Sequence, residues 1–182
     1  MNKKFIKNNI YIDNLNILLR VDYNVPIINS VIQNDNRITN TFETINLLFS
    51  KNINNLIIIS HLGRPKGKIV DSLSLKPIYN YLKKKYNNMV VKFTTLDLAK
   101  DIIDNSNKSI ILIENIRFHP EEEMIDSSKE EICQFQKKIH NLADVYINDA
   151  FGTCHRKHSS IIANGYEIKL GGLLIKKELI NI

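Results

Sequence analysis

Short apolar runs rich in β-branched residues recur along the chain and stop at Gly, Pro, Asn or Asp. Five of them predict buried strands, at residues 17–21, 56–60, 89–93, 109–113 and 145–148. Longer stretches with apolar residues every three or four positions predict helices at 41–50, 75–86, 95–103, 129–142 and 173–179. Strands and helices therefore alternate along the chain.

Strands that are apolar throughout, separated by helices, are typical of a parallel sheet covered on both faces. An antiparallel sheet with one wet face would alternate apolar and polar residues. The sequence predicts an α/β fold: a doubly wound, Rossmann-like parallel sheet with helices on both faces, as a single domain over residues 1–182. A chain of 182 residues with 43% hydrophobic and 24% charged residues suits one globular domain and argues against disorder.

The apolar runs are far shorter than the ~20 residues that a membrane span needs. No signal-peptide-length apolar stretch follows the N-terminal lysines, so we expect a cytoplasmic protein with no membrane partner. The two cysteines, Cys133 and Cys154, stand in unrelated contexts and are expected to be reduced thiols. We take a monomer as the default.

Polar residues gather where the predicted strands end, which is where parallel α/β sheets bind ligands. The segments that follow four of the strands are residues 22–26, 61–65, 114–119 and 149–158. The net charge of +6 favours an anionic partner. Only five of the 25 basic residues are arginines, and Arg64, Arg117 and Arg156 each lie just past a strand end.

A guanidinium group grips phosphate or carboxylate oxygens in pairs, whereas an ammonium is a strongly hydrated point charge. A single loop arginine is as often a surface ion-pair partner as a ligand. Three arginines that agree in position favour a shared site for a small oxyanion.

Several longer strings stand out, and most of them include these strand ends. They are RVDYNVP at 20–26, NRI at 36–38, SHLGRP at 60–65, ENIRFHPEEE at 114–123, NDAFGTCHRKHSS at 148–160 and GGLLIKKEL at 171–179. In order and spacing they resemble the N-terminal, substrate-binding domain of phosphoglycerate kinases. The resemblance spans about residues 16–180. It departs from the family pattern at Ala163, Glu167 and Leu170, and Tyr23 stands where Phe is usual, adding a hydroxyl that needs a partner.

This resemblance implies a glycolytic kinase that moves a phosphoryl group reversibly between 1,3-bisphosphoglycerate and ADP, with this chain holding 3-phosphoglycerate. It implies that Asp22 and Asn24 bind the hydroxyl and carboxylate end of the substrate. The basic residues that would bind the phosphate are His61, Arg64, Arg117, His155 and Arg156. Four further residues of the matching strings complete the implied substrate site: Tyr23, Ser60, Gly63 and Ile116.

Arg37 is the implied catalytic residue, because phosphoryl transfer spreads negative charge over oxygens that a fixed cation can stabilise. Members of the family also carry a C-terminal domain that binds Mg-ADP or Mg-ATP. Two glycine-rich motifs bind nucleotide phosphates, G-x-x-x-x-G-K-S/T and G-x-G-x-x-G after a strand, and neither occurs in residues 1–182. We therefore expect no cofactor and no metal on this chain. We expect that domain to be absent and the isolated chain to be inactive without it.

Three other functions stay open. Cys154, His155 and His158 could form a metal site, because a thiol and two imidazoles are suitable zinc ligands. The positive charge would suit nucleic acid, although no aromatic-interleaved basic stripe or helix-turn-helix signature supports it, so we expect no nucleic-acid partner. The chain could also be a degenerate or regulatory fragment that acts only as a binding module.

Overall fold

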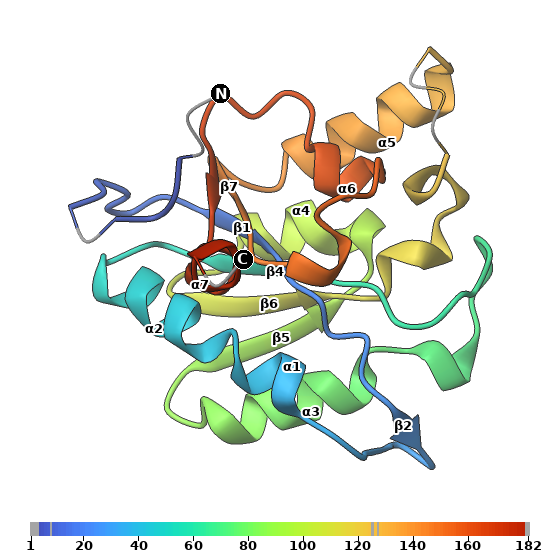
Figure 1. The fold of residues 1–182 in the computed structure, drawn as a ribbon, viewed down its shortest axis with the longest axis horizontal. Helices are drawn as coiled ribbons and strands as arrows, with labels where there is room; N and C mark the ends of the chain where they lie inside the picture. The colour runs from blue at the N-terminus through green and yellow to red at the C-terminus, as the bar shows by residue number, and fades with distance from the viewer. Residues whose placement is uncertain (1–3, 8, 125, 127, 181–182) are drawn as a thin grey trace.

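The computed structural model describes residues 4–7, 9–124, 126 and 128–180, and its centre is a parallel sheet of six strands in the order β5-β6-β4-β1-β7-β8 (Figure 1). The strands are β1 (Ile17–Arg20), β4 (Leu56–Ile59), β5 (Val90–Thr94), β6 (Ser109–Ile113), β7 (Val145–Asn148) and β8 (Lys169–Gly171). In register, Ile17 pairs with Leu56 on one side and with Val145 on the other. The predicted doubly wound α/β fold is confirmed.

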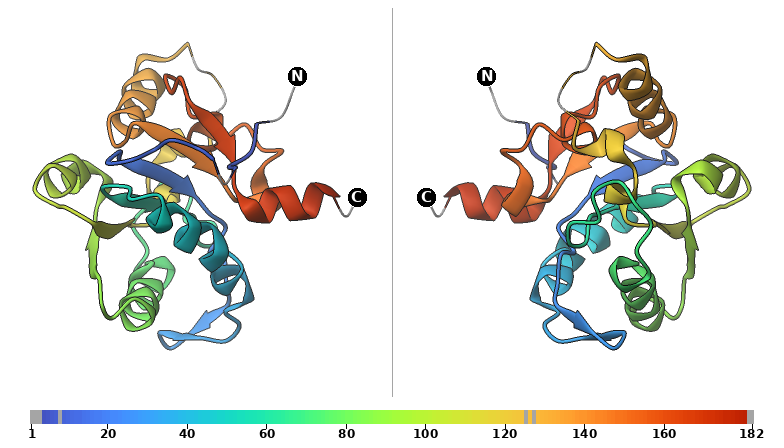
Figure 2. Two further views of the ribbon diagram at one scale, coloured as in Figure 1. Left: turned by 90° about the vertical axis from the view of Figure 1, so that its left-hand side faces the viewer. Right: turned by 90° about the vertical axis from the view of Figure 1, so that its right-hand side faces the viewer.

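Helices cover both faces of this sheet (Figure 2). The longer helices are α2 (Phe42–Ser50), α3 (Lys76–Lys85), α4 (Leu96–Asp104), α5 (Glu130–His140) and α7 (Leu173–Ile180). Two single-turn helices, α1 (Asn36–Thr39) and α6 (Ser159–Ile162), lie in the loops. The 3-10 turns are η1 (Asp71–Leu73), η2 (Ile116–Phe118), η3 (Pro120–Glu122) and η4 (Phe151–Thr153).

The central strands are buried on both faces, and their side chains alternate between two cores. Ile17 and Leu19 enter the core under α2 and α3, whereas Leu18 enters the core under α4 and α5. This division explains why the strands are apolar at every position rather than at every second one. No helix among the described residues is long and apolar enough to be a membrane span.

The hydrophobic pattern of the sequence did not predict the shortest helices and strands. The hairpin of β2 (Ile27–Ile28) and β3 (Val31–Ile32), the edge strand β8, α1 and α6 each hold two to four residues, too few to show a period. The predicted strand at 89–93 lies at 90–94 in the structure. Ala163, where the family usually has Gly, adopts the left-handed conformation with φ 49° that glycine tolerates best.

The carboxylate of Asp149 fixes the start of α7. Asp149 follows β7 and is fully buried, and it accepts hydrogen bonds from the Thr44 hydroxyl and from the backbone N–H of Ile175. A Cβ at Gly172 would lie 2.2 Å from Asp149 Oδ1, so this close approach requires glycine. The position of α7, which projects from the other layers in Figure 2, thus depends on a buried carboxylate next to the site-forming loop.

Candidate anion-binding site

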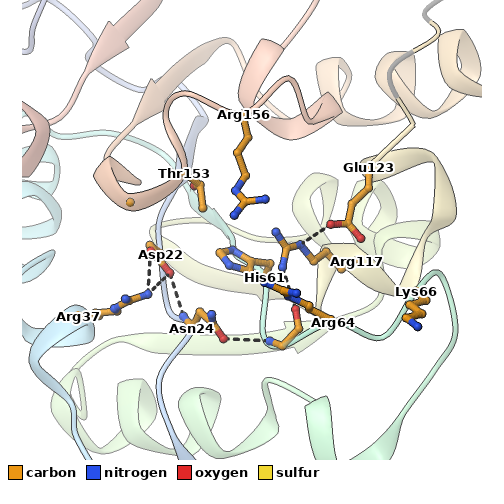
Figure 3. A pocket seen from close by; sticks show the side chains of 12 residues that line it. Asp22, Asn24, Arg37, His61, Arg64, Lys66, Arg117, Glu123, Thr153 and Arg156 are labelled. Carbon is orange, nitrogen blue, oxygen red and sulfur yellow. Dashed lines mark hydrogen bonds and ion pairs between the residues drawn. The ribbon is translucent and has the colours of Figure 1, made fainter.

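A cavity of about 600 Å³ opens where the loops leave β1, β4, β6 and β7 (Figure 3). In the sheet order β1 lies between β4 and β7. After β1 the chain adds β4, β5 and β6 on one side of it, and then crosses back to add β7 and β8 on the other side. Parallel α/β sheets bind ligands at such a switch point, because the loops diverge and leave a crevice. The lining residues are Asp22, Asn24, Arg37, His61, Gly63, Arg64, Lys66, Arg117, Glu123, Gly152, Thr153 and Arg156.

The structure brings most of the sequence-predicted site residues together at this cavity. Those that line it are Asp22, Asn24, Arg37, His61, Gly63, Arg64, Arg117 and Arg156. Figure 3 shows the guanidinium groups of Arg117 and Arg156 pointing into the space beside His61. Arginines from three separate loops therefore meet in one cleft.

Four of the predicted residues do not line the cavity. Tyr23, Ser60 and Ile116 are buried, whereas His155 is exposed and lies outside the lining. The Ser60 hydroxyl accepts a hydrogen bond of 2.8 Å from the backbone N–H of Tyr23, so it ties two strand exits together. The added hydroxyl of Tyr23 lies 2.8 Å from Thr41 Oγ1, which supplies the partner that a buried phenol needs. These side chains support the site, and their contact with a ligand stays a prediction.

The cationic side chains of the cavity differ in whether they already form an ion pair with a carboxylate. Arg64 and Arg156 are exposed, and their guanidinium groups make no hydrogen bond or ion pair with any residue that the structure describes. Arg37 donates through one terminal nitrogen to both carboxylate oxygens of Asp22, at 3.0 and 2.9 Å. The buried Arg117 lies 3.3 Å from Glu123 through its Nε.

Several backbone ties hold Arg117 in place. Its terminal nitrogen donates to the carbonyl of Gly63 at 2.8 Å, and the N–H of Gly63 donates to Asn24 Oδ1 at 2.9 Å. The amide of Asn115 donates to the carbonyl of Leu62 at 2.7 Å and accepts from the N–H of Arg117 at 3.1 Å. The exits of β1, β4 and β6 are thereby joined into one rigid wall, which favours preorganised binding.

His61 faces the cavity as a neutral imidazole. Its pKa falls to about 2, chiefly through burial, and the positive charges of Arg20 and Arg117 act in the same direction. The pKa of the neighbouring His158 falls to about 4, again chiefly through burial. The cavity therefore combines permanent guanidinium charges with the uncharged imidazole of His61 at neutral pH.

Sequence reasoning did not select four of the lining residues, namely Lys66, Glu123, Gly152 and Thr153. Glu123, Gly152 and Thr153 lie inside the strings that mark the site, and Lys66 follows one of them directly. A Cβ at Gly152 would lie 2.7 Å from Asp22 Oδ2, so glycine lets the loop after β7 approach Asp22. For Glu123 the only signal in the sequence is its place in such a string, and the tertiary structure decides that it lies among guanidinium groups.

The described residues bring together no group of three His, Cys, Asp or Glu side chains that could hold a metal ion. The alternative metal site at Cys154, His155 and His158 therefore gains no support. His158 is buried, and its Nε2 lies 3.9 Å from Glu123 Oε1. Cys154 and His155 are exposed. What the cavity offers chemically is an excess of guanidinium groups and hydrogen-bond donors, which suits a small polyanion.

Comparison with known proteins points the same way. The family model described as "Phosphoglycerate kinase" matches residues 7–182. The phosphoglycerate kinase of Plasmodium falciparum is 42% identical over 92% of this chain and 43% of the relative. That of Tetrahymena thermophila is 34% identical over 93% of this chain and 43% of the relative. The chain thus spans less than half of the length of these curated relatives.

Solved structures show the same fold. A phosphoglycerate kinase structure from Coxiella burnetii superimposes with a TM-score of 0.80 at 30% identity, covering 96% of this chain and 43% of that one. A phosphoglycerate kinase from Pyrococcus horikoshii gives a TM-score of 0.81 at 24% identity, covering 97% of this chain and 44% of that one. At that identity the second comparison supports the fold alone.

Proposed function

The chain belongs to the phosphoglycerate kinase family, and from this premise we propose that it forms the part of such a kinase that binds 3-phosphoglycerate. The reaction proposed for the whole enzyme is reversible phosphoryl transfer between 1,3-bisphosphoglycerate and ADP, in glycolysis and in the cytoplasm. One observation carries the proposal: Arg64, Arg117 and Arg156 converge on one cavity, and the guanidinium groups of Arg64 and Arg156 make no hydrogen bond or ion pair with the described residues.

The chemistry of 3-phosphoglycerate matches the two ends of this cavity. The phosphate would lie among the three arginines beside His61, where planar guanidinium groups can bind its oxygens in pairs. Asp22 and Asn24 lie at the end nearer Arg37, where a carboxylate can accept from the substrate hydroxyl and an amide can donate to its carboxylate.

Arg37 is proposed as the catalytic cation. Its side chain is 53% exposed and bound to Asp22, so it lies at the open edge of the cavity rather than among the phosphate-binding arginines. A cation at that edge can stabilise the charge that develops on a phosphoryl group during transfer.

We assign Mg-ADP and Mg-ATP to a C-terminal domain, because residues 1–182 contain neither of the glycine-rich nucleotide motifs sought in the sequence. In this proposal the chain is a monomer that binds 3-phosphoglycerate weakly, and it needs the C-terminal domain as its partner for turnover. A kinase assay with and without the C-terminal half of a family member tests this requirement. Turnover by the chain alone would contradict it.

Isothermal titration calorimetry with 3-phosphoglycerate tests the binding site. Arg156→Gln should weaken binding about tenfold or more, because a charge-assisted contact to phosphate contributes roughly 1.5–3 kcal/mol. Lys157→Gln is the matched control: it makes the same charge change one residue away, on a side chain outside the cavity lining. Equal effects of the two substitutions would show that only net charge matters.

Arg37→Gln separates catalysis from binding. In the reconstituted enzyme it should reduce kcat far more than it reduces the affinity of the chain for 3-phosphoglycerate, because its contribution arises mainly in the transition state. Equal losses in the two measurements would make Arg37 a binding residue only.

A further inference from the structure

A buried arginine lies behind the wall of the cavity, outside the residues assigned above to substrate binding or catalysis. Arg20 ends β1, is fully buried and is not among the lining residues. Its Nε donates to Ser160 Oγ at 2.8 Å, and one terminal nitrogen donates to the carbonyl of Val21. Its other terminal nitrogen lies 3.3 Å from Nδ1 of His61.

A buried guanidinium is costly unless a charge and hydrogen bonds compensate it. Glu122 supplies the charge: it is fully buried, and its Oε1 lies 4.0 Å from Arg20. Ser160 donates to this carboxylate through its N–H at 2.9 Å and its hydroxyl at 2.6 Å. Burial raises the pKa of Glu122, and the Arg20 guanidinium acts against that rise. Arg20, Ser160 and Glu122 therefore form one satisfied cluster that holds the guanidinium against His61.

The direction of the contact to His61 follows from chemistry. A guanidinium has five N–H donors and no acceptor, so Nδ1 of His61 has to present its lone pair to Arg20. A neutral imidazole carries its single proton on the other nitrogen in that case, which is Nε2. The opposite tautomer would point the Nδ1–H at the N–H groups of Arg20 and would lose the hydrogen bond.

Nε2 of His61 is free to meet a ligand. It makes no hydrogen bond within the described part of the chain, and it is not among the buried polar atoms that lack a partner there. His61 lines the cavity, so this open nitrogen belongs to the anion-binding space (Figure 3). An N–H at this position donates to an oxyanion, whereas a lone pair would repel it.

We propose that Arg20 is a positioning residue that fixes His61 as its Nε2–H tautomer and thereby makes this uncharged imidazole a hydrogen-bond donor to the anion in the cavity. The identity of the anion rests on the proposed function. The tautomer does not, because it is a property of the chain without ligand.

The first test is made on the unmodified chain. Histidine is labelled with ¹⁵N, and the His61 resonances are assigned by their loss in His61→Gln. Long-range ¹H–¹⁵N correlation at pH 7 without ligand should show an unprotonated Nδ1 and a protonated Nε2. A protonated Nδ1, whether in the other tautomer or in an imidazolium, would overturn the proposal without any variant of Arg20.

The second test removes the donor. Arg20→Met alone leaves Glu122 buried without its cation and can fail to fold, so it is combined with Glu122→Gln, which removes both buried charges together. In this double variant the tautomers of His61 should mix, and affinity for 3-phosphoglycerate or inorganic phosphate should fall about tenfold. Glu122→Gln alone keeps Arg20 and should keep the single tautomer.

An Arg20 that only stabilised the fold would change the unfolding midpoint and leave the nitrogen resonances of His61 as they are. A folded double variant that retains the pure Nε2–H form therefore overturns the proposal. If the unmodified chain shows that form and the folded double variant loses it, but neither probe binds, the proposed function fails while the role of Arg20 in fixing the tautomer stands.

Discussion

Glu123 should weaken anion binding, and its removal should strengthen it. It is one of the two carboxylates in a cavity lined by five cationic side chains, and its Oε1 lies 3.3 Å from Nε of Arg117. An incoming phosphate has to share that guanidinium with Glu123 and lie near a like charge. Glu123→Gln keeps the shape of the side chain and removes the charge.

The size of the effect follows from exposure. At 3.3 Å and an effective dielectric constant of about 20, the bare attraction is about 5 kcal/mol. The Glu123 side chain is 39% exposed, so hydration offsets most of this. Double-mutant cycles on such partly exposed pairs give at most about 1 kcal/mol. We therefore expect Glu123→Gln to bind 3-phosphoglycerate about fivefold more tightly.

Calorimetry at low and physiological ionic strength measures the change. Glu121→Gln is the matched control, because it removes the same charge two residues away from a side chain outside the cavity lining. The gain should exceed that of the control at both salt concentrations, since the Arg117 side chain is only 6% exposed and weakly screened. Unchanged or weaker binding by Glu123→Gln relative to Glu121→Gln would refute the reasoning.

Three further predictions concern stability. Tyr23→Phe should cost about 1 kcal/mol in urea unfolding by removing the bond to Thr41, and should leave 3-phosphoglycerate affinity unchanged; weaker binding would place Tyr23 in the site after all. Gly172→Ala should cost about 2–3 kcal/mol, because its Cβ would displace the Asp149 carboxylate from its partners, and a loss below about 0.5 kcal/mol would contradict this close approach. His158 has a native pKa of about 4, below the 6.5 of the unfolded chain, so the unfolded state binds more protons in that window and stability falls as pH drops from about 6.5 to 4. The stability difference between the unmodified chain and His158→Gln should therefore shrink from pH 7 to pH 5, and a constant difference would argue against a neutral native His158.

The sequence by itself determined the alternation of apolar strands and helices, and with it the doubly wound sheet. Each of these signals is local: a period or a turn residue is readable within one element. The same is true of the arginines that follow β4, β6 and β7, because parallel strands all end at one edge of the sheet. That rule was enough to predict that Arg64, Arg117 and Arg156 would meet.

Only the tertiary structure decided which partner each side chain has. Arg37 is paired with Asp22, Arg117 is paired with Glu123, and Arg64 makes no such pair with a described residue. These differences depend on how separate loops are placed relative to one another in the folded chain, and no local sequence pattern encodes that placement.

The role of Arg20 shows the same limit most clearly. In the sequence it is one more arginine at the end of an apolar run. Its partner Ser160 lies 140 residues away, and His61 lies 41 residues away. The packing of α6 and η3 against the end of β1 turns these distant residues into one buried cluster, because burial forces every charge and donor there to find a partner.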